Sequence, residues 1–139
     1  MKQFNTCLML SILMAAFFTS PASAVAGVVA IVNKANTSAD RATIGKLYSL
    51  EAKSWSDGAP AKLYELSGES ERDEFFQAYA GKSAGIIKSI WARAVFSGRG
   101  VPPKMLNSDT EMKSEIIKDK NAVGFVDESS VDASVRAVR

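Results

Sequence analysis

The residues best suited to hold a ligand follow a short apolar run that ends at Leu66, where a Ser-Gly pair precedes a helix-forming segment. Such a strand-to-helix turn leaves unpaired backbone N–H groups and the positive end of the helix dipole, which together favour an oxyanion. The groups that could contact it are Ser67, Gly68, Ser70 and Arg72. Arg99, between two glycines, could aim a second guanidinium at the same anion or lie solvated in its loop.

Acidic residues crowd the same turn. Glu69, Glu71, Asp73 and Glu74 all fall within its first helical residues. Carboxylates there interact with the helix dipole themselves and repel a second anion. The turn therefore has the backbone of an anion site together with side chains that oppose one.

The elements around this turn alternate between strand and helix. An apolar run over 25–32 predicts a buried strand, and an apolar stripe predicts a helix over 39–50, capped by Thr37 or Ser38. A Trp-Ser-Asp-Gly turn leads to a strand over 62–66, and Phe75, Phe76 and Tyr79 mark the next helix. This order predicts an α/β fold, a mixed sheet flanked by helices.

The second half of the chain continues the pattern after a break predicted at Gly81 and Gly85. The strongest amphipathic signal is a stripe over 86–95 whose members are Ile86, Ile87, Ile90, Trp91, Ala94 and Val95. It predicts a helix packed on the sheet or, alternatively, a helix that binds a partner. A loop over 96–103, a helix begun by Ser108 with Glu111, and strands over 122–126 and in 131–139 complete the chain.

Composition excludes several kinds of chemistry. The 139-residue chain predicts one domain, and its net charge of +2 does not favour nucleic-acid binding. It contains no histidine, and its single cysteine precedes residue 25. A Ser-His-Asp or Cys-His triad and a zinc site built on His or Cys are therefore excluded from the segment after residue 24. We expect no enzymatic activity, no cofactor and no metal site.

The N-terminus has the features of a secretory signal peptide. Lys2 precedes an apolar stretch over 7–18, and Ala22-Ser23-Ala24 forms a cleavage signal. The apolar stretch is shorter than the roughly 20 residues that a membrane-spanning helix needs. We expect cleavage after Ala24, a periplasmic protein over 25–139, and no membrane span after cleavage.

The motifs in order resemble a known family. The segments are VVAIVNKAN, WSDG, GESERDEFF, WARAVFSGRGVPPK and NAVGFV. Together they resemble one lobe of the phosphate ABC-transporter substrate-binding proteins, and more closely the short, single-lobe proteins called phosphate-binding. The resemblance covers 28–126 and implies a periplasmic-binding-protein-like lobe, phosphate as ligand and an ABC transporter as partner.

The resemblance also locates the site. The family's first glycine corresponds to Gly68 and its arginine to Arg72, whereas its phosphate-contacting serine and threonine fall on Glu69 and Glu71. A single lobe leaves a bound anion half exposed, unless a homodimer supplies a second wall.

Three functions follow as alternatives. An oxyanion-binding protein requires Arg72 and Arg99 to converge near the helix start, and Arg72→Ala should then abolish binding but leave the fold largely intact. An envelope protein-interaction module without a ligand predicts an exposed apolar patch instead of a pocket. A carboxylate-dependent enzyme requires acidic groups that face each other across a cleft.

Overall fold

A five-stranded mixed sheet organises residues 27–139, the part of the chain that the computed structural model describes. The strand order is β3-β2-β4-β1-β5, with β1 antiparallel to β4 and β5, and β2 parallel to β3 and β4. The predicted signal peptide lies outside the described residues. The strands are β1 Val28–Val32, β2 Lys62–Leu66, β3 Lys104–Leu106, β4 Ala122–Asp127 and β5 Arg136–Val138.

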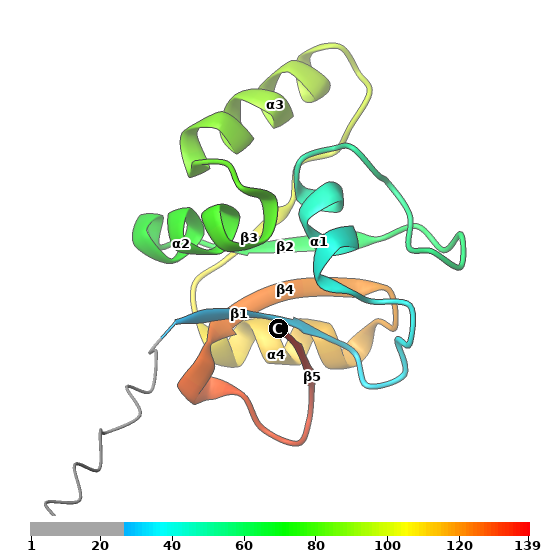
Figure 1. The fold of residues 1–139 in the computed structure, drawn as a ribbon, viewed down its shortest axis with the longest axis vertical. Helices are drawn as coiled ribbons and strands as arrows, with labels where there is room; N and C mark the ends of the chain where they lie inside the picture. The colour runs from blue at the N-terminus through cyan, green and yellow to red at the C-terminus, as the bar shows by residue number, and fades with distance from the viewer. Residues whose placement is uncertain (1–26) are drawn as a thin grey trace, which may run out of the picture.

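Helices cover both faces of the sheet, which confirms the α/β prediction (Figure 1). They are α1 Arg41–Tyr48, α2 Glu69–Ala80, α3 Ala84–Phe96, α4 Asp109–Lys118 and the short 3-10 helix η1 Glu128–Ser130. Neighbouring residues of β4 point to opposite faces. Phe125 meets α2, whereas Met112 of α4 lies against Gly124. No helix in the described range is both long and apolar enough to cross a membrane.

An aromatic cluster fixes α2 on the sheet. Phe75 stacks on Phe125 with ring centroids 4.2 Å apart and on Tyr79 at 4.6 Å, and Tyr48 meets Phe75 edge-on at 5.1 Å. The helical α2 stripe read from the sequence is therefore the core contact. The helices α1 and α2 cross closely at Gly45, where a β-carbon would overlap the carbonyl oxygen of Tyr79.

Several element ends differ from the sequence-based predictions. Helix α1 begins after Asp40, which caps it by accepting a hydrogen bond from Thr43 N at 2.9 Å, so Thr37 and Ser38 are not its caps. Gly85 lies inside α3 and does not break it, because Ser83 caps that helix one residue before Ala84. Strand β3 was not predicted at all, since three residues after two prolines show no periodic pattern.

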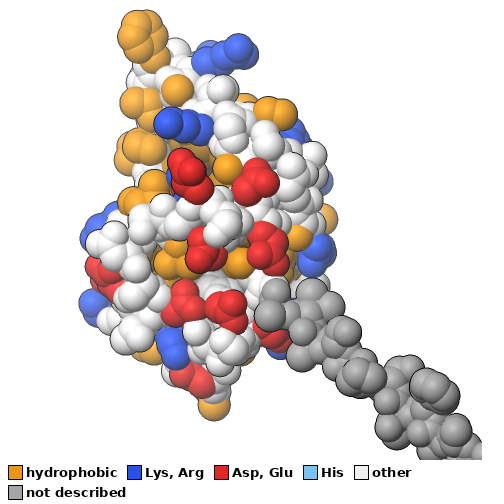
Figure 2. Space-filling model, turned by 90° about the vertical axis from the view of Figure 1, so that its left-hand side faces the viewer, with side chains coloured by type: hydrophobic (Ala, Val, Ile, Leu, Met, Phe, Trp, Pro, Cys, Tyr) orange, Lys and Arg blue, Asp and Glu red, His pale blue; other side chains and the backbone are white. Residues whose placement is uncertain are grey.

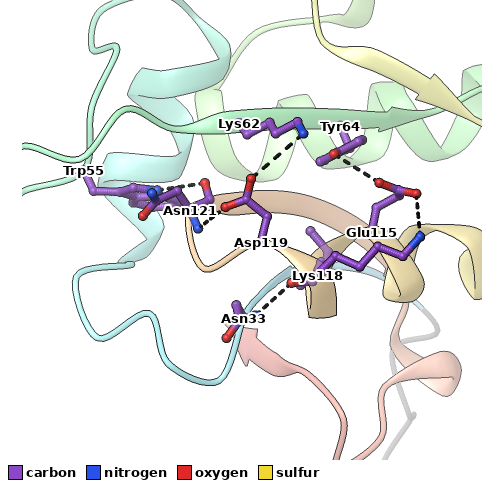
Figure 3. Close-up of polar contacts among 9 residues, drawn as sticks. Asn33, Trp55, Lys62, Tyr64, Glu115, Lys118, Asp119 and Asn121 are labelled. Atoms are coloured by element: carbon purple, nitrogen blue, oxygen red, sulfur yellow. Dashed lines mark hydrogen bonds and ion pairs between the residues drawn. The ribbon is translucent and has the colours of Figure 1, made fainter.

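Polar contacts hold the start of β2 beside α4 (Figure 3). Trp55 Nε1 donates to the Asn121 carbonyl oxygen at 3.0 Å, and Tyr64 Oη donates to Glu115 Oε2 at 3.3 Å. Lys62 Nζ lies 3.9 Å from Asp119 Oδ2. These contacts explain why β2, which follows the Trp-Ser-Asp-Gly turn, lies next to β4.

Helix α3 stands away from the sheet and packs mainly on α2 (Figure 1). Ile87 and Trp91 are buried, and Trp91 Nε1 donates to the Tyr48 carbonyl oxygen at 2.8 Å. Ile86 is 52% exposed and Val95 44%. The predicted packing of the whole stripe on the sheet is therefore wrong, because only one edge of the stripe meets the body of the molecule.

Candidate functional site

The predicted strand-to-helix turn forms as expected. β2 ends at Leu66, and Gly68 is the N-cap of α2, with φ −66° and ψ 125° and no side-chain cap hydrogen bond. Its neighbour Ser67 donates its backbone N–H to the Leu106 carbonyl oxygen at 2.9 Å, so this N–H serves the β2–β3 ladder. The backbone of an anion site is present at the start of a 12-residue helix.

The Glu71 carboxylate already lies at this turn. It folds back over Gly68 so closely that a β-carbon on the glycine would overlap it, and it accepts a hydrogen bond from Ser70 Oγ at 3.0 Å. A carboxylate in the first turn interacts favourably with the helix dipole. Glu71 therefore supplies the negative charge that a bound oxyanion would bring, and Ser70 is engaged with it.

Arg72 is paired inside the protein. Its Nε lies 3.1 Å from Glu65 Oε2, with the two side chains 16% and 6% exposed. Burial raises the pKa of Glu65 above its ordinary value, and the charge and hydrogen bond of Arg72 oppose that rise. The guanidinium thus compensates a buried carboxylate of β2.

The hollow in front of the turn is acidic. A cavity of about 260 Å³ separates the starts of α2 and α4, and its charged lining residues are Glu71, Asp109 and Asp127. Figure 2 shows Asp and Glu side chains gathered across the middle of one face, with hydrophobic side chains along its upper left margin. Ser67 and Gly68 line this cavity, whereas Arg72 and Arg99 do not.

The same hollow brings carboxylates of α2 and α4 together, as the enzyme alternative requires. Asp109 Oδ2 accepts hydrogen bonds from Asp127 N at 3.2 Å and from Ser130 Oγ at 2.6 Å. Hydrogen bonds from Ser129 hold the pKa of Asp127 below its ordinary value. These contacts show that Asp109 and Asp127 act as turn and cap residues.

Arg99 lies elsewhere. Its Nε donates to Ser97 Oγ at 3.1 Å, and it lines a cavity between α1, α3 and the start of β2. Arg72 lines a different hollow, beneath the C-terminal end of α3. The structure therefore separates the predicted site residues into three places: Ser67, Gly68 and Ser70 at the turn, Arg72 beneath α3, and Arg99 in the third cavity.

Sequence reasoning missed the cations that accompany Arg99. Lys53, Lys62 and Lys104 line the same cavity, from the α1–β2 loop, from β2 and from β3. Each lysine by itself is an ordinary surface residue, and they are separated along the chain. No local motif marks them, because only the sheet order and the position of α3 bring them together.

Comparison with known proteins gives the fold. No protein-family model and no curated protein matches the sequence. Among solved structures, a protein described as a phosphate ABC transporter substrate-binding protein, from Clostridium perfringens with bound phosphate, superposes with a TM-score of 0.61 at 23% identity over 81% of this chain and 44% of its own. An ABC-type phosphate transport receptor from Vibrio cholerae gives 0.52 at 23% identity, over 81% of this chain and 45% of its own.

These matches confirm the predicted resemblance at the level of the fold. The chain spans less than half the length of each of these two proteins. It has the fold of one part of a phosphate-transporter substrate-binding protein, a periplasmic-binding-protein-like α/β lobe.

Proposed function

We propose that this protein is an exported interaction module that keeps the lobe fold of solute-binding proteins and does not hold phosphate at the α2 turn. The observation that carries the proposal is an apolar groove beneath the C-terminal end of α3, with a volume of about 540 Å³. The large apolar residues of this apolar groove are Trp91, Val95, Phe96, Pro102, Pro103 and Met105, and Glu65, Arg72 and Lys88 also line it.

The groove is open to solvent along most of its length. Phe96 is 96% exposed, Met105 47% and the nearby Val101 85%. A contiguous exposed apolar surface next to polar residues marks an interaction site more often than an isolated exposed side chain does. This arrangement is the exposed apolar patch that the interaction alternative required.

The charged residues around the apolar groove indicate the chemistry of the partner that it binds. The segment 81–108 contains Lys82, Lys88, Arg93, Arg99 and Lys104 and no aspartate or glutamate. An apolar groove set among cations is complementary to an apolar segment flanked by carboxylates. We therefore take the partner to be an acidic, apolar segment of another envelope protein. The two copies of a homodimer would present the same cations to each other.

Site-specific photo-crosslinking in cells that express the full chain tests this proposal. A photoreactive benzoylphenylalanine replaces Phe96 in one variant. In the control it replaces Ile117 of α4, which is 50% exposed and lies outside the groove. We expect a discrete adduct from position 96 only, and we expect it to weaken when Lys88 and Arg93 are changed to glutamate.

The outcomes separate the alternatives. An adduct of twice the chain mass would identify a second copy as occupant and overturn the acidic partner. Equal labelling at both positions, or none at position 96, would overturn the groove as an interaction site. Cell fractionation with N-terminal sequencing of the same cultures checks export, for which we expect a periplasmic chain that begins at Val25.

Phosphate remains a second candidate ligand, because the Clostridium perfringens structure that shares this fold holds phosphate. Calorimetric titration of the 25–139 chain with phosphate and then sulfate at low salt tests it. The proposal predicts no saturable heat at millimolar anion. One-site heat in the unchanged protein that Ser70→Ala weakens would instead establish an oxyanion site at the α2 turn, and with it a solute-binding protein of the phosphate type.

A further inference from the structure

A further cavity, here called the basic pocket, adjoins the apolar groove and shares Trp91, Pro102 and Pro103 with it. It has a volume of about 350 Å³ and is bounded by the end of α1, the start of β2, α3 and the loop after α3. Its lining includes Leu47, Leu50, Leu63, Trp91, Val101 and Pro103. Both its volume and its apolar lining are typical of small-molecule sites.

The charged groups of the basic pocket all carry the same sign. Lys53, Lys62, Arg99 and Lys104 line it, and no aspartate or glutamate does. Four cations from separate segments around one cavity concentrate positive potential over an apolar, low-dielectric surface. An anion that reaches this surface is attracted more strongly than it would be by one solvated lysine.

A hydrogen bond connects two loops that border the pocket, and the cations that line it still have N–H groups that can donate to a ligand. Lys53 Nζ donates to the Arg99 carbonyl oxygen at 3.2 Å, which ties the α1–β2 loop to the loop after α3. Within the described part of the chain, the only side-chain hydrogen bond of Arg99 uses Nε. Lys62 lies 3.9 Å from Asp119, a loose pairing between partly exposed groups that is worth little.

The apolar lining of the pocket and its four cations together favour the binding of an amphipathic anion. Inorganic phosphate would leave the apolar lining in contact with water, and a neutral apolar solute would form no ion pair with the cations. An apolar body is stabilised by leaving water, and a carboxylate by charge-assisted hydrogen bonds from a guanidinium and an ammonium. We propose that the basic pocket binds a small organic acid, whose apolar body lies against Leu63 and Trp91 and whose carboxylate meets Arg99 and Lys104.

This inference does not rest on the interaction module proposed above. The phosphate test is made at the start of α2, whereas Trp91 lines both the basic pocket and the apolar groove, so variants at Arg99 and Ala61, which line the basic pocket and not the groove, assign its signal. The chain contains two tryptophans, Trp91 and Trp55. Trp55 does not line the pocket and is 3% exposed. The two indole N–H signals therefore give a probe and an internal reference in the same spectrum.

The test is an NMR titration of the ¹⁵N-labelled 25–139 chain with 2-naphthoate. The matched probe is 2-naphthamide, which has the same apolar body without the charge. We expect a saturable shift of the Trp91 indole with naphthoate, no comparable shift of Trp55, and affinity for naphthamide weaker by about tenfold or more. Equal affinity for both probes, or no saturable shift of Trp91, would overturn the proposal.

Variants assign the contact to the pocket. Arg99→Gln should weaken naphthoate binding by about tenfold, and Lys34→Gln, at an exposed lysine that does not line the pocket, should leave it unchanged. Ala61→Phe fills the cavity and should abolish binding of both probes. If that variant does not fold, Arg99→Gln still decides, because an exposed side chain seldom controls folding. Unchanged affinity in Arg99→Gln would contradict the proposed carboxylate contact.

Discussion

The α2 turn and the basic pocket differ in where their charge comes from. The turn has the backbone of an anion site, and the protein's own Glu71 carboxylate already lies over Gly68. The basic pocket has no recognisable motif, yet four cations line it without a carboxylate. The backbone geometry of a motif can therefore persist while its side chains change, and cations can gather around a cavity where no motif is present.

Helix α3 borders the basic pocket and not the α2 turn, and Trp91 anchors this helix. We expect Trp91→Ala to lower the free energy of unfolding by about 3 to 5 kcal/mol, because it removes a large buried side chain and its hydrogen bond to the Tyr48 carbonyl. Urea denaturation measures the loss. Hydrogen exchange should show faster opening of α3 than of the start of α2. Uniform acceleration across both helices would show that the two regions are not independent.

Arg72 should matter for stability more than its place in a predicted binding motif suggests. Arg72→Ala leaves Glu65 buried without its partner, which we expect to cost about 2 to 3 kcal/mol at neutral pH. The expectation from sequence alone, that this variant leaves the fold largely intact, therefore changes. Chemical denaturation of Arg72→Ala against Arg93→Ala, at an exposed arginine of α3, measures the difference. Equal stability of the two variants would show that the pair contributes nothing.

The sign of the pH dependence follows from Glu65. Its pKa in the folded protein is raised above the ordinary 4.5. The folded state thus holds this proton more tightly than the unfolded chain, so the contribution of Glu65 to stability is fully present below pH 4.5 and is lost as the pH rises through the raised pKa. Arg72→Ala should enlarge that loss, and Glu65→Gln should remove it. Denaturation at a series of pH values from 4 to 8 measures both.

A smaller effect is expected at the α2 turn itself. Glu71→Gln removes the carboxylate from the first turn and should cost about 0.5 kcal/mol through the helix dipole. It should also admit weak, millimolar phosphate binding, which calorimetry detects. Glu69→Gln in the same turn is the control, because it is Glu71 that folds over Gly68. Phosphate binding restored equally by both variants would mean that overall charge, and not the position of Glu71, excludes the anion.

The smallest expected effect on stability is at the groove. Phe96→Ser changes a side chain that is 96% exposed, so the free energy of unfolding should change by less than about 0.5 kcal/mol. Binding of the acidic partner should nevertheless fall strongly, and Ile117→Ser should not affect it. A large loss of stability in Phe96→Ser would show that the side chain packs in solution and is not available to a partner.

The sequence by itself determined the local elements. The stripe of Phe75, Phe76 and Tyr79 predicted the buried face of α2, and the Ser-Gly pair located its start, because helical periodicity and capping are encoded within a few residues. The order of the motifs also predicted the lobe fold, which the solved structures share.

Only the tertiary structure decided the rest. Strand β3 exists because β2 offers it a parallel partner, and Ile86 and Val95 of the α3 stripe are exposed because α3 rests on α2 and not on the sheet. Arg99 joins three lysines because the strand order and the position of α3 bring separate segments together. Arg72 turns back to Glu65 across the β2–α2 turn because that carboxylate is buried. The pairing of strands, the burial of each charge and its partner depend on the packed structure, which no local pattern of residue types records.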